Sequence, residues 1–202
     1  TNTPTDIGAD AGNFLNLDVS SPIITYTPIP NQASCGPATN INLLVTITDM
    51  QSGISLASNL PRLYIRRSIG GAPGNTWGSL AQITGSFVSG NSNVSDWQFI
   101  IDYTALGITP LPGNEFEYYI VAQDLAAPIN IGYSQNNAFS PVHSNVSTPV
   151  IFPNFAFPAN GMFSFSNPLS GTVTVGTAGD YANFNNATTG LFKAIMDRGI
   201  AS

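Results

Sequence analysis

The chain has 202 residues, enough for one full domain with some additional structure. Only 8% of the residues are charged, whereas roughly a quarter are charged in an ordinary globular domain. The net charge of −6 provides no positive field for a nucleic acid or an anionic membrane surface, and no apolar run approaches the roughly 20 residues of a membrane span. The composition therefore predicts an extracellular or cell-surface protein with no nucleic-acid partner and no membrane insertion.

Short segments of β-branched and aromatic residues, separated by Gly and Pro turns, follow one another along the chain. Segment 40–49 alternates in the way expected for a strand buried on one face, with Leu43, Val45 and Ile47 on the same side. The predicted strands, in chain order, are 22–28, 40–49, 61–68, 77–88, 94–103, 115–124, 129–133 and 138–142. Turns at this spacing predict an all-β, immunoglobulin-like β-sandwich over residues 21–169.

The two ends of the chain do not fit the sandwich pattern. Residues 1–20 are polar and rich in Gly and Asp, so we interpret them as a linker or as the tail of a preceding domain. Residues 170–202 are expected to contain a brief strand at 171–175 followed by a short helix. The predicted fold is thus a β-sandwich with a short C-terminal segment of strand plus helix.

The C-terminal helix is predicted from about Asn185 to Arg198, because apolar residues recur there at helical spacing. Asn185 or Asn186 is the expected N-cap. Lys193 and Asp197 stand four residues apart and are expected to form an ion pair on the helix surface. The apolar face of such a helix needs a partner, which is either the sandwich or a neighbouring domain.

Several segments resemble parts of very large Bacteroidetes surface proteins. Segment 171–181, Gly-Thr-Val-Thr-Val-Gly-Thr-Ala-Gly-Asp-Tyr, resembles the opening of their right-handed parallel β-helix (pectin-lyase-like) domains, in which a strand and a short amphipathic helix cap the first coil. Segment 5–10 resembles the closing part of such a β-helix. Segments 22–28, 61–67 and 118–124 resemble the Ig-like or fibronectin-like repeat that separates the β-helices.

This resemblance implies that the chain is one interdomain unit. It would comprise the tail of one β-helix domain or a linker at 1–20, an Ig-like β-sandwich at 21–169, and the strand and capping helix that open a following β-helix domain at 170–202. The resemblance also implies an adhesin-like parent protein exported by the type IX secretion system. Neighbouring domains of the same parent chain would then be its main partners.

The sequence offers little for catalysis. A nucleophilic site needs a nucleophile, a base and an orienting group, but His143 is the only histidine and no G-x-S-x-G motif is present. We interpret Cys35 as a partly buried thiol, with a nucleophile or an intermolecular bridge as the alternatives. Glu115 and Glu117 share one face of one strand, so we interpret them as solvated charges beside a turn. We predict that the chain is not an enzyme.

Calcium is the ion that the sequence suits best, because aspartates stand at presumed strand ends and in loops, where oxygen ligands can converge. Asp49 and Asp124 are the best candidates, since each ends a strong predicted strand. The alternative for every aspartate is an Asx-turn. The aspartates considered are Asp6, Asp10, Asp18, Asp49, Asp96, Asp102 and Asp124.

Aromatic side chains give a second candidate site. Trp77, Tyr64 and Tyr133 could stack on the pyranose rings of a glycan if they are exposed, whereas the alternative is packing between the sheets. The function predicted first is a structural spacer or adhesion module of a large cell-surface or secreted protein. The alternatives are a carbohydrate-binding module and an accessory domain of a polysaccharide-degrading enzyme.

Overall fold

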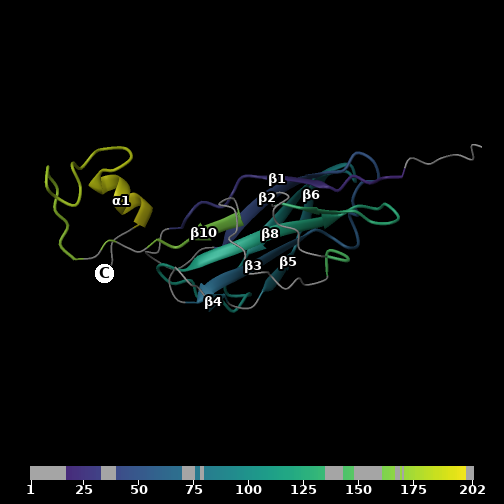
Figure 1. Ribbon diagram of the computed structural model, residues 1–202, viewed down its shortest axis with the longest axis horizontal. Helices are drawn as coiled ribbons and strands as arrows, with labels where there is room; N and C mark the ends of the chain where they lie inside the picture. The colour runs from purple at the N-terminus through teal and green to yellow at the C-terminus, as the bar shows by residue number, and fades with distance from the viewer. Residues whose placement is uncertain are drawn as a thin grey trace, which may run out of the picture.

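The computed structural model describes two antiparallel β-sheets and one short helix (Figure 1). The described residues are 17–32, 40–69, 76–77, 80–134, 143–147, 161–166, 169 and 171–198. The elements are β1 (Ile23–Tyr26), β2 (Ile41–Thr48), β3 (Arg62–Ile69), β4 (Thr76–Trp77), β5 (Ala81–Thr84), β6 (Ser86–Gly90), β7 (Val94–Ile101), β8 (Glu115–Gln123), β9 (Ile131–Tyr133), β10 (Met162–Ser164) and α1 (Leu191–Arg198).

The strand order is that of an immunoglobulin-like sandwich. One sheet has the order β1-β2-β7-β6, and the other has the order β10-β8-β3-β4, with β5 also paired to β3 and β9 to β8. Immunoglobulin-like domains place strands A, B, E and D in one sheet and C, F and G in the other. Here β1, β2, β7 and β6 take the first set of positions, and β3, β8 and β10 take the second. The predicted fold class, an all-β sandwich, is confirmed.

The core lies between the two sheets and is built from the inward faces of β2, β7 and β8. Trp97 and Phe99 of β7 are completely buried, and Ile47 of β2 is buried beside them in the same cluster. Tyr118 and Ile120 face them from β8. The predicted alternation of burial is present in β2 and β7, and the residues predicted to share a face of β8 lie in the core. Full burial of each large apolar side chain contributes about 1.5–3 kcal/mol.

The outer face of β3 and β8 is also buried, which the sequence pattern does not indicate. Tyr64 is only 1% exposed and stacks on Tyr119 with ring centroids 5.1 Å apart. The described residues 143–147 cover this face, and Val146 belongs to the same apolar cluster. Glu117 is 2% exposed and accepts a hydrogen bond from Arg66. Interpreting Glu117 as a solvated charge is therefore wrong, because a second layer covers its strand.

The C-terminal segment differs in detail from the prediction. An isolated bridge between Val175 and Tyr181 occurs where the brief strand was expected. The Asn186 side chain accepts the backbone amides of Thr188 and Thr189, as a cap would, but residues up to Gly190 form a turn and α1 begins only at Leu191. Backbone hydrogen bonds from Leu191 and Phe192 reach back eight residues, to Asn183 and Phe184, so the chain loops before the helix starts.

Within α1, the predicted ion pair between Lys193 and Asp197 is present. The carbonyl of Asp197 also accepts a hydrogen bond of 3.1 Å from the hydroxyl of Ser166, at the end of the sandwich where β10 ends. Among the described residues, no helix has the length and hydrophobicity needed to cross a membrane. The expected strand at 138–142 and residues 1–16 lie outside the described part of the chain.

The described chain begins and ends at opposite ends of the long axis. Residues 17–22, which we call the lead-in segment, reach β1 from one end of the sandwich, and α1 lies beyond the other end (Figure 1). The lead-in segment is held closely against β9. A Cβ atom at Gly132 would lie 2.0 Å from the carbonyl oxygen of Pro22, so only glycine permits this approach.

Candidate functional site

Three buried aspartates meet at the end of the sandwich that holds the lead-in segment. Asp49 directly follows β2, Asp124 directly follows β8, and Asp18 lies in the lead-in segment. One carboxylate oxygen from each residue lies within 4.8 Å of those of the other two. The exposed fractions of the three residues are 9% for Asp18, 5% for Asp49 and 1% for Asp124. The structure thus brings the two best metal candidates together and adds a third.

The loop after β2 folds around the Asp49 carboxylate. Its Oδ1 accepts the backbone amides of Gln51, Ser52 and Gly53, each at 3.1 Å. Gly53 has a φ of 72°, a left-handed conformation that favours glycine and closes this turn. The Ser52 amide also donates to Oδ2 of Asp18 at 3.0 Å, so the same loop contacts the lead-in segment.

The loop between β8 and β9 holds the Asp124 carboxylate in a similar way. Oδ1 accepts the backbone amide of Asn130 at 2.7 Å and that of Ala126 at 3.2 Å. The Asn130 side-chain amide donates to Oδ2 of Asp124 at 2.6 Å and to the backbone carbonyl of Asp18 at 3.0 Å. Asn130 therefore ties this loop to the lead-in segment.

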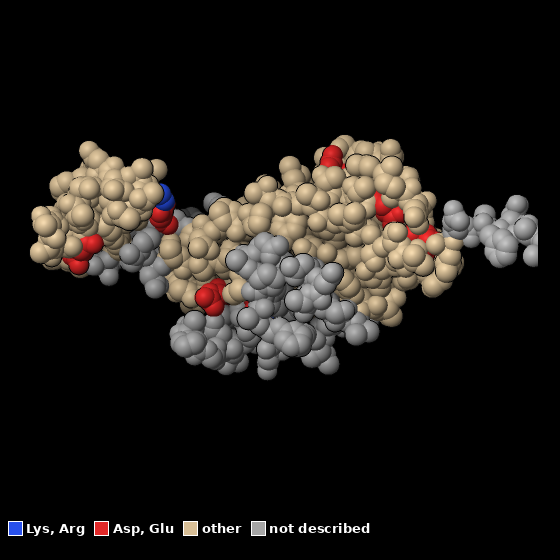
Figure 2. Space-filling model, turned by 45° about the horizontal axis from the view of Figure 1, so that its top comes forward, with Lys and Arg blue, Asp and Glu red and all other residues tan. Residues whose placement is uncertain are grey.

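Among the described side chains, no Lys or Arg forms an ion pair with this cluster. The ion pairs among the described residues are Arg66 with Glu117 and Lys193 with Asp197, and neither lies at the cluster. Figure 2 shows acidic side chains over this end of the sandwich and no basic side chain beside them. Carboxylates this close repel one another when they are charged. All the Lys and Arg residues lie in β3 or α1, at Arg62, Arg66, Arg67, Lys193 and Arg198.

The hydrogen bonds leave one carboxylate oxygen unused. Oδ2 of Asp49 is buried and has no hydrogen-bond partner. Hydrogen bonds from Ser52 and from the backbone amide of Ser20 hold the pKa of Asp18 below its ordinary value, which favours its charged form. The cluster therefore combines buried negative charge with a free oxygen, which is the chemistry of a hard-cation site.

Asp96 and Asp102, the other candidate aspartates that the structure describes, do not join the cluster. Asp102 forms an Asx-turn of the kind given as the alternative, in which Oδ1 accepts the amides of Thr104 and Ala105 at 2.9 and 3.1 Å. Asp18, Asp49 and Asp124 each accept the amide two residues further on in the same way. Asp96 lies on the outer face of the four-stranded sheet. Asp6 and Asp10 lie outside the described residues.

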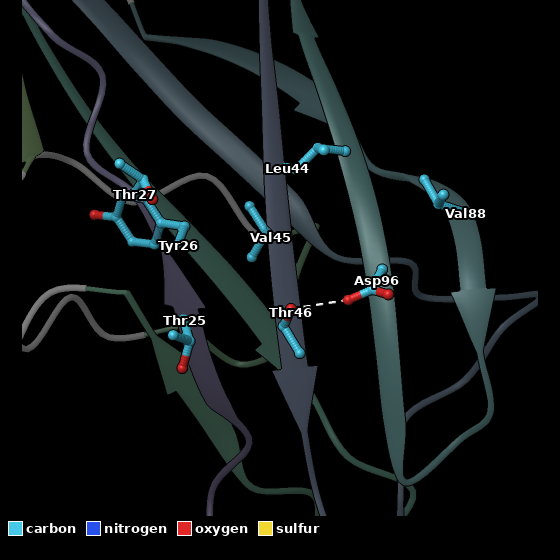
Figure 3. Close-up of a pocket in the computed structure, with 8 residues that line it drawn as sticks. All are labelled: Thr25, Tyr26, Thr27, Leu44, Val45, Thr46, Val88 and Asp96. Carbon is cyan, nitrogen blue, oxygen red and sulfur yellow. Dashed lines mark hydrogen bonds between the residues drawn. The ribbon is translucent and has the colours of Figure 1, made fainter.

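Asp96 lines a shallow hollow of about 480 Å³ on that face (Figure 3). Its Oδ1 accepts the hydroxyl of Thr46 at 2.8 Å, and its Oδ2 accepts that of Ser89 at 2.7 Å. These hydrogen bonds, with that from Ser89 the stronger, lower the pKa of Asp96. The ring of Tyr26 packs edge-on against Tyr118, with centroids 6.1 Å apart. Asp96, Thr46 and Tyr26 of the hollow are thus already engaged within the protein.

The three aromatic residues proposed for glycan stacking do not form an exposed platform in the described structure. Tyr64 is not available for stacking, because its ring is buried and its hydroxyl donates to the carbonyl of Val146 at 2.6 Å. Tyr133 is half-buried, and its hydroxyl accepts the backbone amide of His143 at 3.2 Å. The side chain of Trp77 lies outside the described part of the structure.

His143 has a structural setting. Its Nε2 forms a 3.0 Å hydrogen bond with the hydroxyl of Tyr119, and its Nδ1 forms one of 3.1 Å with the carbonyl of Asn145. The imidazole is tilted against the ring of Tyr64 at 5.3 Å. These contacts fix residues 143–147 on the outer face of β3 and β8. Cys35 lies outside the described residues.

The burial of His143 predicts a pH dependence of stability. Burial lowers the pKa of the imidazole, so protonation favours the unfolded chain. The free energy of unfolding should fall as the pH drops below about 6.5, the ordinary histidine pKa, and this contribution should level off below the folded-state pKa. Urea unfolding at pH 7.5 and 5.0 should show a larger loss for the native chain than for His143→Gln. An equal or larger loss in the variant would contradict this explanation.

Comparisons with known proteins found little. No protein-family model and no curated protein matches the chain. Among solved structures, AggA, the major subunit of aggregative adherence fimbriae type I from Escherichia coli, is similar to 58% of this chain over 92% of its own length. The identity is 11% and the TM-score is 0.27. A structural similarity this distant does not bear on the function of this chain.

Proposed function

We propose that this chain is a structural spacer or adhesion module of a larger extracellular or cell-surface protein. The observation that carries the proposal is the placement of the lead-in segment and α1 at opposite ends of the sandwich (Figure 1). A module that the chain enters at one end and leaves at the other can be joined to neighbours in series. The low charge, 8% of residues, suits a surface whose contacts are other modules of the same parent chain.

The parent that we propose is a large adhesin-like protein exported by the type IX secretion system. This part of the proposal is supported by the resemblance of segment 171–181 to the opening of Bacteroidetes β-helix domains. The apolar side chains of Phe192 and Met196 on α1 are exposed, as expected for a helix whose partner is a following domain.

A glycan-binding experiment separates the spacer from the carbohydrate-binding alternative. Isothermal calorimetry is used to titrate the purified chain with a panel of soluble polysaccharides. The spacer proposal predicts no saturable binding. Trp77→Ala is the informative variant, because Tyr64 is buried and the Trp77 side chain lies outside the described structure. Saturable binding that disappears in Trp77→Ala, with an unchanged circular dichroism spectrum, would replace the spacer with a carbohydrate-binding module.

A further inference from the structure

We propose that Asp18, Asp49 and Asp124 bind one calcium ion, which clamps the lead-in segment to the two loops after β2 and β8. This inference goes beyond the proposed function, because it concerns how one end of the module is held and by which ligand. It does not require the parent protein to be an adhesin.

The spacing of the carboxylates fits a single ion. Calcium binds oxygen ligands at about 2.3–2.6 Å, so two oxygens on one ion are at most about 4.6–5.2 Å apart. The three aspartate oxygens all lie within 4.8 Å of one another. They come from three separate parts of the chain, the lead-in segment and the ends of β2 and β8. One ion among them would therefore cross-link all three.

The hydrogen bonding around Asp49 gives a second, independent indication of a ligand. Oδ1 is saturated by the three loop amides, yet Oδ2 is buried with no hydrogen-bond partner in a residue that is only 5% exposed. A buried polar atom left unpaired costs about 1–3 kcal/mol, and more when the group is charged. Coordination of a cation would satisfy this oxygen and offset the repulsion from the neighbouring carboxylates.

The donor set favours calcium over other ions. The ligand atoms are all oxygens, and the described residues place no histidine or cysteine in the group, whereas zinc prefers nitrogen and sulfur. The carboxylates are carried by irregular loops, and calcium tolerates irregular geometry with 6–8 oxygens. Magnesium needs a near-octahedral shell at about 2.0–2.1 Å and keeps most of its waters. Extracellular modules commonly bind calcium with a Kd of about 10⁻⁴–10⁻³ M, which is the range expected here.

The contacts around the cluster show what the ion would stabilise. The lead-in segment is already held by Ser52, through the Asp18 carboxylate, and by Asn130, through the Asp18 carbonyl. The close approach of Pro22 to Gly132 continues the same contact. Calcium would add the strongest of the contacts that hold the lead-in segment. The direction in which the preceding chain meets the sandwich would then depend on calcium.

The experiment is calcium titration of the purified chain, with melting temperature and isothermal calorimetry as the two measurements. The variants are Asp49→Asn and Asp124→Asn, in which the amide oxygen can still accept the loop hydrogen bonds. The matched control is Asp102→Asn, because Asp102 also accepts two backbone amides in a turn but is not in the cluster. Calcium chloride and magnesium chloride are the ligands added, and a chelator defines the ion-free state.

We expect the melting temperature of the native chain and of Asp102→Asn to rise with calcium, with one ion bound per chain. Asp49→Asn and Asp124→Asn should bind at least about tenfold more weakly. No calcium response of the native chain at 10 mM would overturn the proposal, and so would a response retained by both cluster variants. An equal response to magnesium would overturn the assignment to calcium. The native-chain titration decides the matter even if a cluster variant fails to fold.

Hydrogen exchange tests the clamp itself. With calcium, the backbone amides of Ser20, Ser52 and Asn130 should exchange at least about tenfold more slowly than in chelator, and Asp18→Asn should abolish the difference. Calcium binding with unchanged exchange at Ser20 would contradict the clamp. These results are independent of the parent protein, so a failed calcium site leaves the spacer proposal standing, and a failed spacer proposal leaves the calcium site standing.

Discussion

Replacing Trp97 with alanine is expected to lower the free energy of unfolding by about 3–5 kcal/mol. Trp97 is completely buried between the sheets, and its indole Nε1 donates to the hydroxyl of Ser95 at 2.9 Å. Its ring also meets Phe87 of the edge strand β6 edge-on, with centroids 5.7 Å apart. Truncation removes these contacts and leaves a cavity that the surrounding strands cannot fill. Chemical denaturation monitored by circular dichroism measures the change.

Ile100→Ala is the control for Trp97→Ala. Ile100 lies in the same strand, but its side chain is on the exposed outer face. Its replacement should change the free energy of unfolding by no more than about 1 kcal/mol, the range of strand propensities. A similar loss for Trp97→Ala and Ile100→Ala would mean that the core does not lie between the two sheets as described.

Replacing Arg66 with alanine is expected to lower the free energy of unfolding by about 3–5 kcal/mol, because it leaves the Glu117 carboxylate buried without its counter-ion. Arg66 and Glu117 are joined at 2.8 Å, and both are almost fully buried. Replacing both residues, with Arg66→Met and Glu117→Leu, should recover most of the loss, since an apolar pair needs no counter-charge. Urea denaturation of the three proteins gives the comparison.

The effect of Arg66→Ala should also depend on pH. Burial raises the pKa of Glu117 to about 7, with the Arg66 guanidinium opposing the rise. Between about pH 4.5 and 7, the folded chain therefore holds a proton that the unfolded chain has lost, and stability falls as the pH rises. The difference between the native chain and Arg66→Ala should be larger at pH 8, where Glu117 is charged, than at pH 5. A difference that does not change with pH would show that the ion pair is not its source.

Much of the sandwich follows from local patterns. In β2 and β7 burial alternates along the strand, and β2, β7 and β8 each have a buried inner face, as predicted. The period of two shows which residues share a face, but it does not show whether the second face is covered. The pattern therefore does not indicate that Tyr64 and Glu117 are buried. Tyr64 is covered by residues 143–147, far along the chain, and no local pattern reports that contact.

Two of the three residues of the candidate metal site, Asp49 and Asp124, are predicted from the sequence as the best ligands. Asp49 and Asp124 each follow a strong predicted strand. Because strands end at the two ends of a β-sandwich, the pattern places both residues at an end of the fold. Asp18 stands in a polar segment with no periodicity, and its position depends on the contact of Asn130 and Gly132 with the lead-in segment. The helix begins at Leu191 and not near Asn185, because apolar residues keep their helical spacing through the turn that precedes α1.

The size of the intact parent protein tests the central claim most directly. An antibody raised against this chain would be used to probe the cell-surface and secreted fractions of the organism that produces it. The account predicts a very large polypeptide, retained at the surface, that carries this module within it. A free species close to 21.2 kDa, the mass of this chain alone, would contradict the spacer proposal.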